Sequence, residues 1–261
     1  MKLPIFQVDA FTDEVFGGNP AAVCPLEQWL PDNVMQHIAI ENAVAETVFF
    51  KQVGQVFEIR WFTPEIEMDL CGHATLAAAH VIAKHLNYGS PVIEFQSNSG
   101  KLSVAVQEEL LTLNFPARKP KPSQAPQLVL DAIQHPPTEV LKSRDYVLVF
   151  EDESIIRHLN PKQGLLDQIN LDPGGVVITA QGDKVDFVSR FFTPQASIFE
   201  DPVTGSAHCS LIPYWSEKLG KNSMQALQLS PRGGKLLCQH LGSRVLISGQ
   251  AVTFLEGYIT L

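Results

Sequence analysis

One stretch of this chain occurs twice, and this repetition limits the folds that the sequence can adopt. The first copy reads WFTPEIEMDLCGHA at residues 61–74, and the second reads FFTPQASIFEDPVTGSA at residues 191–207. Each copy follows an arginine and leads through a variable loop into a helix-like segment, and residues 73–86 align with residues 206–219 without a gap. Because order and spacing recur at a distance of about 130 residues, we predict two structural halves of similar fold.

Apolar periodicity and turn residues predict the elements of both halves. We expect helices over 31–40, 72–86 and 204–219. The expected strands are 4–10, 46–50, 56–62, 91–96, 101–106, 110–115, 146–150, 176–179, 185–192, 226–230, 235–239, 244–248 and 252–260. The helix at 72–86 is apolar almost all round, which indicates that a sheet covers most of its sides. Successive strands joined by short turns favour mostly antiparallel sheets, so the predicted class is α+β.

A proline-rich segment separates the two halves. Residues 117–126 read ARKPKPSQAP, and their three prolines argue against a continuous strand or helix there. We therefore place the first half at residues 1–118 and the second at 119–261. The last strand is a candidate to pair back with the first half.

Composition excludes several classes of protein. The 261 residues are 45% hydrophobic and 18% charged, which is typical of a globular chain. A net charge of -9 argues against partners such as nucleic acid or an anionic membrane surface. There is no apolar stretch of bilayer-spanning length. The four cysteines are scattered without a Cys-x-x-Cys motif, so we expect a cytoplasmic protein without a disulfide framework or a zinc ribbon.

Both copies of the repeat place a glycine and a polar residue at a predicted helix start. These pairs are Gly72 with His73, and Gly205 with Ser206. A helix start offers unpaired backbone N–H groups and the positive end of the helix dipole. Two such ends facing one cleft would bind a small carboxylate, whereas ordinary helix capping explains either one alone.

Two acidic residues have no counterpart in the other copy. Glu46 begins an apolar strand, and the constant offset places Val176 opposite it. Partial desolvation there would raise the pKa of a carboxyl group and suit it to acid–base chemistry, although an exposed strand-end glutamate is the simpler interpretation. Asp201 lies in the longer second loop, where an ordinary acidic residue at a helix start is the better interpretation from the residues alone.

His73 and Cys71 flank the first helix start. The helix dipole disfavours an imidazolium, so we expect a neutral His73, with a capping or packing role as the alternative. Cys71 precedes the helix at a position that can lower a thiol's pKa, or is simply a small buried residue. His80 lies on the same helix face as His73, but without a recognisable third ligand we expect no metal site.

Five motifs resemble the PhzF (phenazine biosynthesis-like) family. They are FGGNPAAV at 16–23, IAIENAVAETVF at 38–49, RWFTP at 60–64, CGHAT at 71–75 and EDPVTGSA at 200–207. The resemblance implies the diaminopimelate-epimerase-like fold: two similar halves, each a sheet or barrel curled round a central helix, with the active site in the cleft between them. It also implies an isomerase that needs no cofactor or metal and moves a proton between carbons of a small ring acid.

The resemblance also implies roles for particular residues. Glu46 would be the general acid/base, and His73 and Asp201 would polarise and hold the substrate. The substrate-binding positions would be Gly72, Gly205, Ser206 and Asn19. The partner is then a small anionic carboxylate, and a homodimer is left open.

Two alternatives remain beside this isomerase. The wider superfamily contains two-thiol amino-acid epimerases, whose thiols would fall at Cys71 and Thr204. A threonine hydroxyl is far too weak an acid to replace a thiol, which disfavours that chemistry. The other alternative is a binding protein that keeps the fold without turnover.

Overall fold

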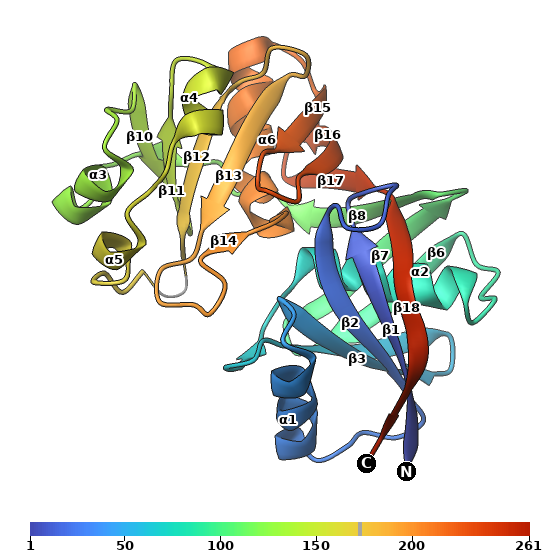
Figure 1. Cartoon of the computed structure of the whole chain (residues 1–261). Coiled ribbons are helices and arrows are strands. Elements are labelled where there is room, and N and C mark those ends of the chain that lie inside the picture. The colour runs from blue at the N-terminus through green and yellow to red at the C-terminus, as the bar shows by residue number, and fades with distance from the viewer. Residues whose placement is uncertain (172–173) are drawn as a thin grey trace. The chain divides into compact units, whose positions relative to one another are not determined.

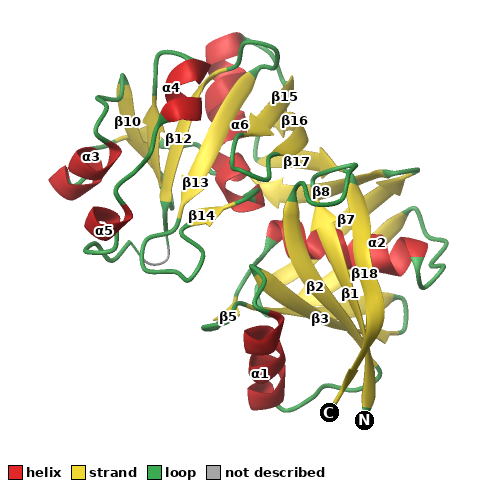
Figure 2. Ribbon diagram, in the orientation of Figure 1, coloured by secondary structure: helices red, strands yellow, loops and turns green. Residues whose placement is uncertain are grey.

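The computed structural model describes residues 1–171 and 174–261 (Figure 1). These residues form two compact units: Met1–Phe115 together with Ile247–Leu261, and Pro116–Leu246. The second unit therefore ends before the last strand, which belongs to the first unit. Figure 2 shows that strands predominate in both units, as the predicted α+β class requires.

The first unit is a mixed sheet around one buried helix. Its helices are α1 (Asp32–Asn42) and α2 (Gly72–Lys84). Its strands are β1 (Lys2–Ala10), β2 (Asn19–Leu26), β3 (Glu46–Val53), β4 (Val56–Phe62), β5 (Glu67–Met68), β6 (Val92–Ser97), β7 (Gly100–Gln107), β8 (Leu110–Pro116) and β18 (Ala251–Thr260). Every residue of α2 from Gly72 to Ile82 is buried, and α2 packs against β1, β2, β3, β7 and β18. This confirms that a helix apolar on all sides is covered by sheet.

The second unit is built in a similar way. Its helices are α3 (Gln127–Ile133), α4 (Glu153–His158), α5 (Gln163–Leu166) and α6 (Gly205–Leu219). Its strands are β9 (Lys121–Pro122), β10 (Glu139–Lys142), β11 (Tyr146–Val149), β12 (Val176–Gln181), β13 (Phe187–Phe192), β14 (Glu200–Asp201), β15 (Ser223–Gln228), β16 (Gly234–Leu241) and the first half of β17 (Arg244–Gly249). The order β12-β13-β14-α6-β15-β16 matches β3-β4-β5-α2-β6-β7 of the first unit.

The same ion pair holds the repeated motif in each unit. Arg60 donates from Nε and an NH2 group to both oxygens of Glu67, at 2.7 and 2.6 Å. Arg190 donates in the same way to Glu200, at 2.7 and 2.8 Å. Each pair ties the strand before the motif to the short strand that precedes the central helix, so the start of that helix is fixed.

The sheets are mostly antiparallel, as predicted, but β2–β3, β4–β6, β11–β12 and β13–β15 are parallel pairs. A helix lies between the two strands of each parallel pair, as crossover connections require. The segment 117–126 contains β9, which pairs with β10 through Lys121 and Pro122; proline is tolerated at a sheet edge. The short helices α3, α4 and α5 were not expected at all. Among the described residues, no helix is both long and apolar enough to cross a bilayer.

Candidate active site

A carboxylate and an imidazole meet at the start of α2. Glu46 is the first residue of β3, and His73 is the second residue of α2. His73 Nε2 lies 3.0 Å from Glu46 Oε2, and the side chains are 4% and 15% exposed. Glu46 is thus partly desolvated, as its position before an apolar strand predicted.

The other ring nitrogen of His73 faces an amide and a thiol. Asn19 Nδ2 lies 3.1 Å from His73 Nδ1, and Cys71 Sγ lies 3.6 Å from the same atom. Asn19 begins β2 directly after a tight turn. Gly18 has φ +60, and a Cβ there would lie 2.2 Å from the Ala10 carbonyl oxygen, so the turn that delivers Asn19 requires glycine.

The protonation of His73 differs from the expectation of a neutral ring. Burial favours the neutral imidazole, but Cys71 and Glu46 outweigh it, and the pKa of His73 is raised well above 6.5. We assign most of this effect to Glu46, because burial raises the pKa of Cys71 to about 11 and keeps its thiol neutral. A carboxylate 3.0 Å away outweighs both burial and the helix dipole, which acts only through partial charges.

The facing atoms of Glu46 and His73 could still bind a further group. His73 Nε2 and Glu46 Oε2 face each other at 3.0 Å, and neither atom has a further hydrogen-bond partner among the described residues. Buried polar atoms are costly unless they find partners. Both atoms are therefore suited to interact with a third group that enters the site.

In the second unit, Asp201 and the start of α6 are held by a small network. Thr204 Oγ1 donates to Asp201 Oδ2 at 2.5 Å. Gln228 accepts from the Thr204 N–H at 2.9 Å and donates to the Asp201 carbonyl at 2.8 Å. Gly205 is the first residue of α6, and Ser206 follows it. The predicted residues of this unit thus lie within one short, well-braced segment.

Arg144 is a neighbour of Ser206 that sequence reasoning missed. It donates to Ser206 Oγ at 2.9 Å and to Asp145 Oδ1 at 3.1 Å. Asp145 is 1% exposed and accepts from the Gly175 N–H at 2.9 Å; burial raises its pKa despite the guanidinium. The turn carrying Arg144 has no motif of its own, so only the tertiary structure links it to α6.

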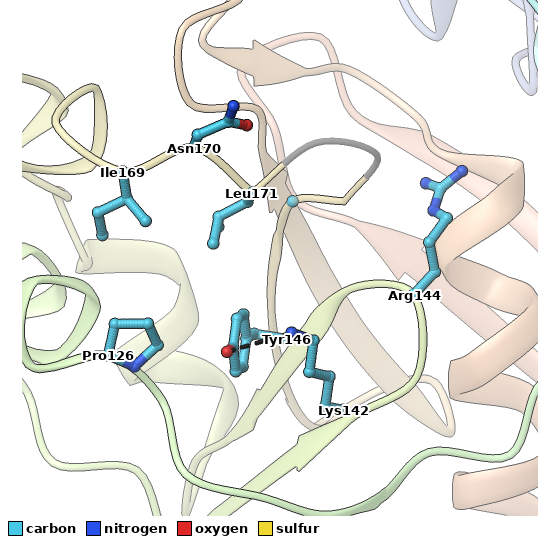
Figure 3. A pocket seen from close by; sticks show the side chains of 8 residues that line it. Pro126, Lys142, Arg144, Tyr146, Ile169, Asn170 and Leu171 are labelled. Atoms are coloured by element: carbon cyan, nitrogen blue, oxygen red, sulfur yellow. Dashed lines mark hydrogen bonds between the residues drawn. The ribbon is translucent and has the colours of Figure 1, made fainter.

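Arg144 also lies at the edge of a pocket of about 240 Å³ (Figure 3). Lys142 and Tyr146 line the same pocket, and the Lys142 ammonium donates to the Tyr146 hydroxyl at 3.2 Å. Two cationic side chains, Lys142 and Arg144, thus line the same pocket.

The α+β fold and the buried Glu46–His73 pair make the start of α2 a candidate active site. The sequence model of the phenazine biosynthesis-like protein family matches residues 8–257, so the chain belongs to that family. An uncharacterized isomerase from Pseudomonas aeruginosa is 48% identical over 261 residues and covers all of both chains. A human phenazine biosynthesis-like domain-containing protein is 37% identical over 292 residues, again across both full lengths.

Solved structures agree with this assignment. A PhzF-family protein from Enterococcus faecalis superposes with a TM-score of 0.96 at 46% identity, covering all of both chains. A hydroxyproline epimerase from Agrobacterium vitis shares the fold alone, with a TM-score of 0.63 at 8% identity and coverage of 99% and 92%. Relatives that are 43–48% identical are named isomerases, and the present chain is an enzyme of the isomerase type.

Proposed function

We propose that this protein is a cofactor-independent isomerase that moves a proton between carbons of a small carboxylic acid. The substrate would be a dihydro-hydroxyanthranilate-like acid or a related compound. The observation that supports this most directly is the buried Glu46–His73 contact of 3.0 Å at the start of α2. A general base must lie beside a group that fixes its orientation, and the His73 imidazole fixes the Glu46 carboxylate in this way.

In the proposed reaction Glu46 acts first as a base and then as an acid. Its carboxylate removes a proton from one carbon, the C–H electron pair moves into the adjacent unsaturated system, and the same proton returns to a second carbon. No net oxidation or reduction occurs. A protonated His73 stabilises the Glu46 carboxylate before the transfer and can donate to the substrate as charge develops.

The proposal gives substrate-binding roles to residues of both units. Gly72 and Asn19 belong to the first unit, and Asp201, Gly205 and Ser206 belong to the second. The bracing of Asp201 by Thr204 and the contact of Ser206 with Arg144 support these roles, because binding groups need fixed positions. A joint grip on one carboxylate, a cytoplasmic location and a homodimer stay predictions.

An epimerase that uses two thiols is the weaker alternative. Burial keeps the Cys71 thiol protonated, with a pKa of about 11. Thr204, at the position of the second thiol, donates its hydroxyl proton to Asp201. Neither group is thus poised to remove a proton from carbon. The binding-protein alternative leaves the close Glu46–His73 contact without a purpose.

The test is a screen of small unsaturated acids for deuterium incorporation from D2O, read by NMR. Glu46→Gln keeps the size of the side chain but cannot accept a proton, so turnover should fall by at least about a hundredfold while affinity for the acid changes little. Glu41→Gln is the matched control, because Glu41 is an exposed glutamate of α1. Near wild-type turnover by the Glu46 variant would refute the proposed proton transfer.

A further inference from the structure

We propose that Glu46, Cys71 and His73 form a binding site for a divalent cation of the zinc class. Each residue offers one ligand atom, a carboxylate oxygen, a thiol sulfur or an imidazole nitrogen, and these atoms lie within 4.8 Å of one another. Nitrogen, sulfur and carboxylate oxygen are the ligand types that Zn²⁺ takes in proteins. The inference does not depend on the isomerase proposal, because ion binding is measured directly.

The distances fit an ion after small side-chain movements. His73 Nε2, the ligand nitrogen, lies 3.0 Å from Glu46 Oε2, whereas the 3.6 Å contact of Cys71 Sγ is with the other ring nitrogen, Nδ1, so the thiol must turn toward the Nε2 side to reach the same ion. From ordinary bond lengths, the ligand atoms of a tetrahedral zinc ion stand about 3.3–3.7 Å apart. The spread of 4.8 Å therefore needs to close by about 1 Å, which rotation of the Glu46 and Cys71 side chains can supply.

Two ligand atoms are buried and, among the described residues, have only each other as a polar partner. These atoms are His73 Nε2 and Glu46 Oε2, and the His73 side chain is only 4% exposed. A cation that displaces the proton of His73 Nε2 coordinates both atoms at once. A bound thiol loses its proton to the ion, so thiolate and carboxylate together neutralise the two charges of the metal in a site with little water.

A neighbouring amide can orient the histidine ligand, and one ligand is partly open to solvent. Asn19 lies 3.1 Å from His73 Nδ1, and an amide can present its oxygen to the ring N–H of a metal-bound histidine. Glu46, with 15% of its side chain exposed, marks the side from which an ion can enter. Three protein ligands leave a fourth position open to water or another small ligand.

This ion would be an inhibitor of the proposed chemistry, and not its cofactor. It would hold the same carboxylate and imidazole that the proton transfer requires to be free. Hard ions such as Mg²⁺ prefer oxygen ligands and should not compete for a site that contains sulfur and nitrogen.

The experiment titrates the purified reduced protein with Cd²⁺ and follows the ultraviolet thiolate-to-metal charge-transfer absorption. We expect one equivalent to bind, Zn²⁺ to displace it, and excess Mg²⁺ to leave it in place. Cys71→Ala should abolish the absorption, and Cys71→Ser serves as a second variant if the alanine protein folds poorly by circular dichroism. Cys209→Ala is the matched control, because Cys209 is also a buried free cysteine and should be dispensable.

Calorimetry adds a readout that does not require the thiol. Glu46→Gln should raise the Kd for Zn²⁺ by at least about a hundredfold, since loss of a second-shell partner alone typically costs 10–100-fold. Absence of the charge-transfer absorption at one equivalent, its persistence in both Cys71 variants, or an unchanged Kd in Glu46→Gln would each overturn the proposal.

Discussion

Truncation of Gln228 should weaken the second unit and disturb Asp201. Gln228 is 1% exposed and lies at the end of β15. Its side chain accepts from the Thr204 N–H and donates to the Asp201 carbonyl and to Thr204 Oγ1. Gln228→Ala removes all three bonds and leaves both backbone groups without that partner.

The size of the effect follows from how buried those groups are. The Thr204 N–H is buried, so the loss of its acceptor should cost up to about 3 kcal/mol. The Asp201 carbonyl is only partly buried, and water can replace the lost donor there, so its share is about 1 kcal/mol or less. We therefore expect the free energy of unfolding of the second unit to fall by about 2–4 kcal/mol.

The assay must distinguish the two units, because they need not unfold together. Hydrogen exchange read by mass spectrometry reports separately on peptides from α6 and β15 and on peptides from α2. The matched control is Gln225→Ala on the same strand: Gln225 is exposed, and its stability change should stay within about 0.5 kcal/mol. A loss in Gln228→Ala no larger than in this control would show that the network does not hold the segment.

Three shorter predictions follow from other buried groups. Burial lowers the pKa of His208 from 6.5 to about 4, so between these pH values the unfolded chain binds a proton that the folded chain does not. The free energy of unfolding should therefore fall as the pH drops from about 6.5 to about 4, by up to about 1.4 kcal/mol per pH unit. Urea titrations at several pH values should show a weaker dependence of this free energy on pH in His208→Gln. Arg190→Gln leaves the largely buried Glu200 carboxylate without its guanidinium and should cost about 3 kcal/mol or more in the same titration, whereas a loss below 1 kcal/mol would contradict this. Cys71→Ala should keep most of the turnover on any acid that the screen finds, because its thiol is protonated; a loss as large as that of Glu46→Gln would restore thiol chemistry.

Much of the fold could be predicted because local pattern and global packing agree. The apolar helix at 72–86 needed cover on every side, and the sheet of the first unit provides it. The parallel pairs could not be predicted in the same way, since pairing direction depends on where a crossover helix packs and not on the strand's own residues. The helices α3, α4 and α5 are too short for a clear apolar period.

The candidate site shows the same division. The motifs placed Glu46, Asn19 and His73 on separate elements, and the structure brings their side chains together. The protonation of His73 was beyond the sequence, because it depends on a distance between two elements and outweighs the local helix dipole. Arg144 and Gln228 carried no signal either, since their contacts to α6 and its approach are made only in the folded chain.

Thr204 helps to decide between two reaction types, epimerisation by two bases and a proton shift by one base. Two-base epimerisation needs an acid on each face of one carbon, and a threonine hydroxyl bonded to Asp201 cannot serve as the second. A shift of a proton between two carbons needs only one group that takes the proton and returns it. Our proposal gives this role to Glu46, whose Oε2 lies 3.0 Å from His73 Nε2. The replacement of one thiol by Thr204 therefore favours a single-base isomerase, with Asp201 as a fixed contact and not as a second base.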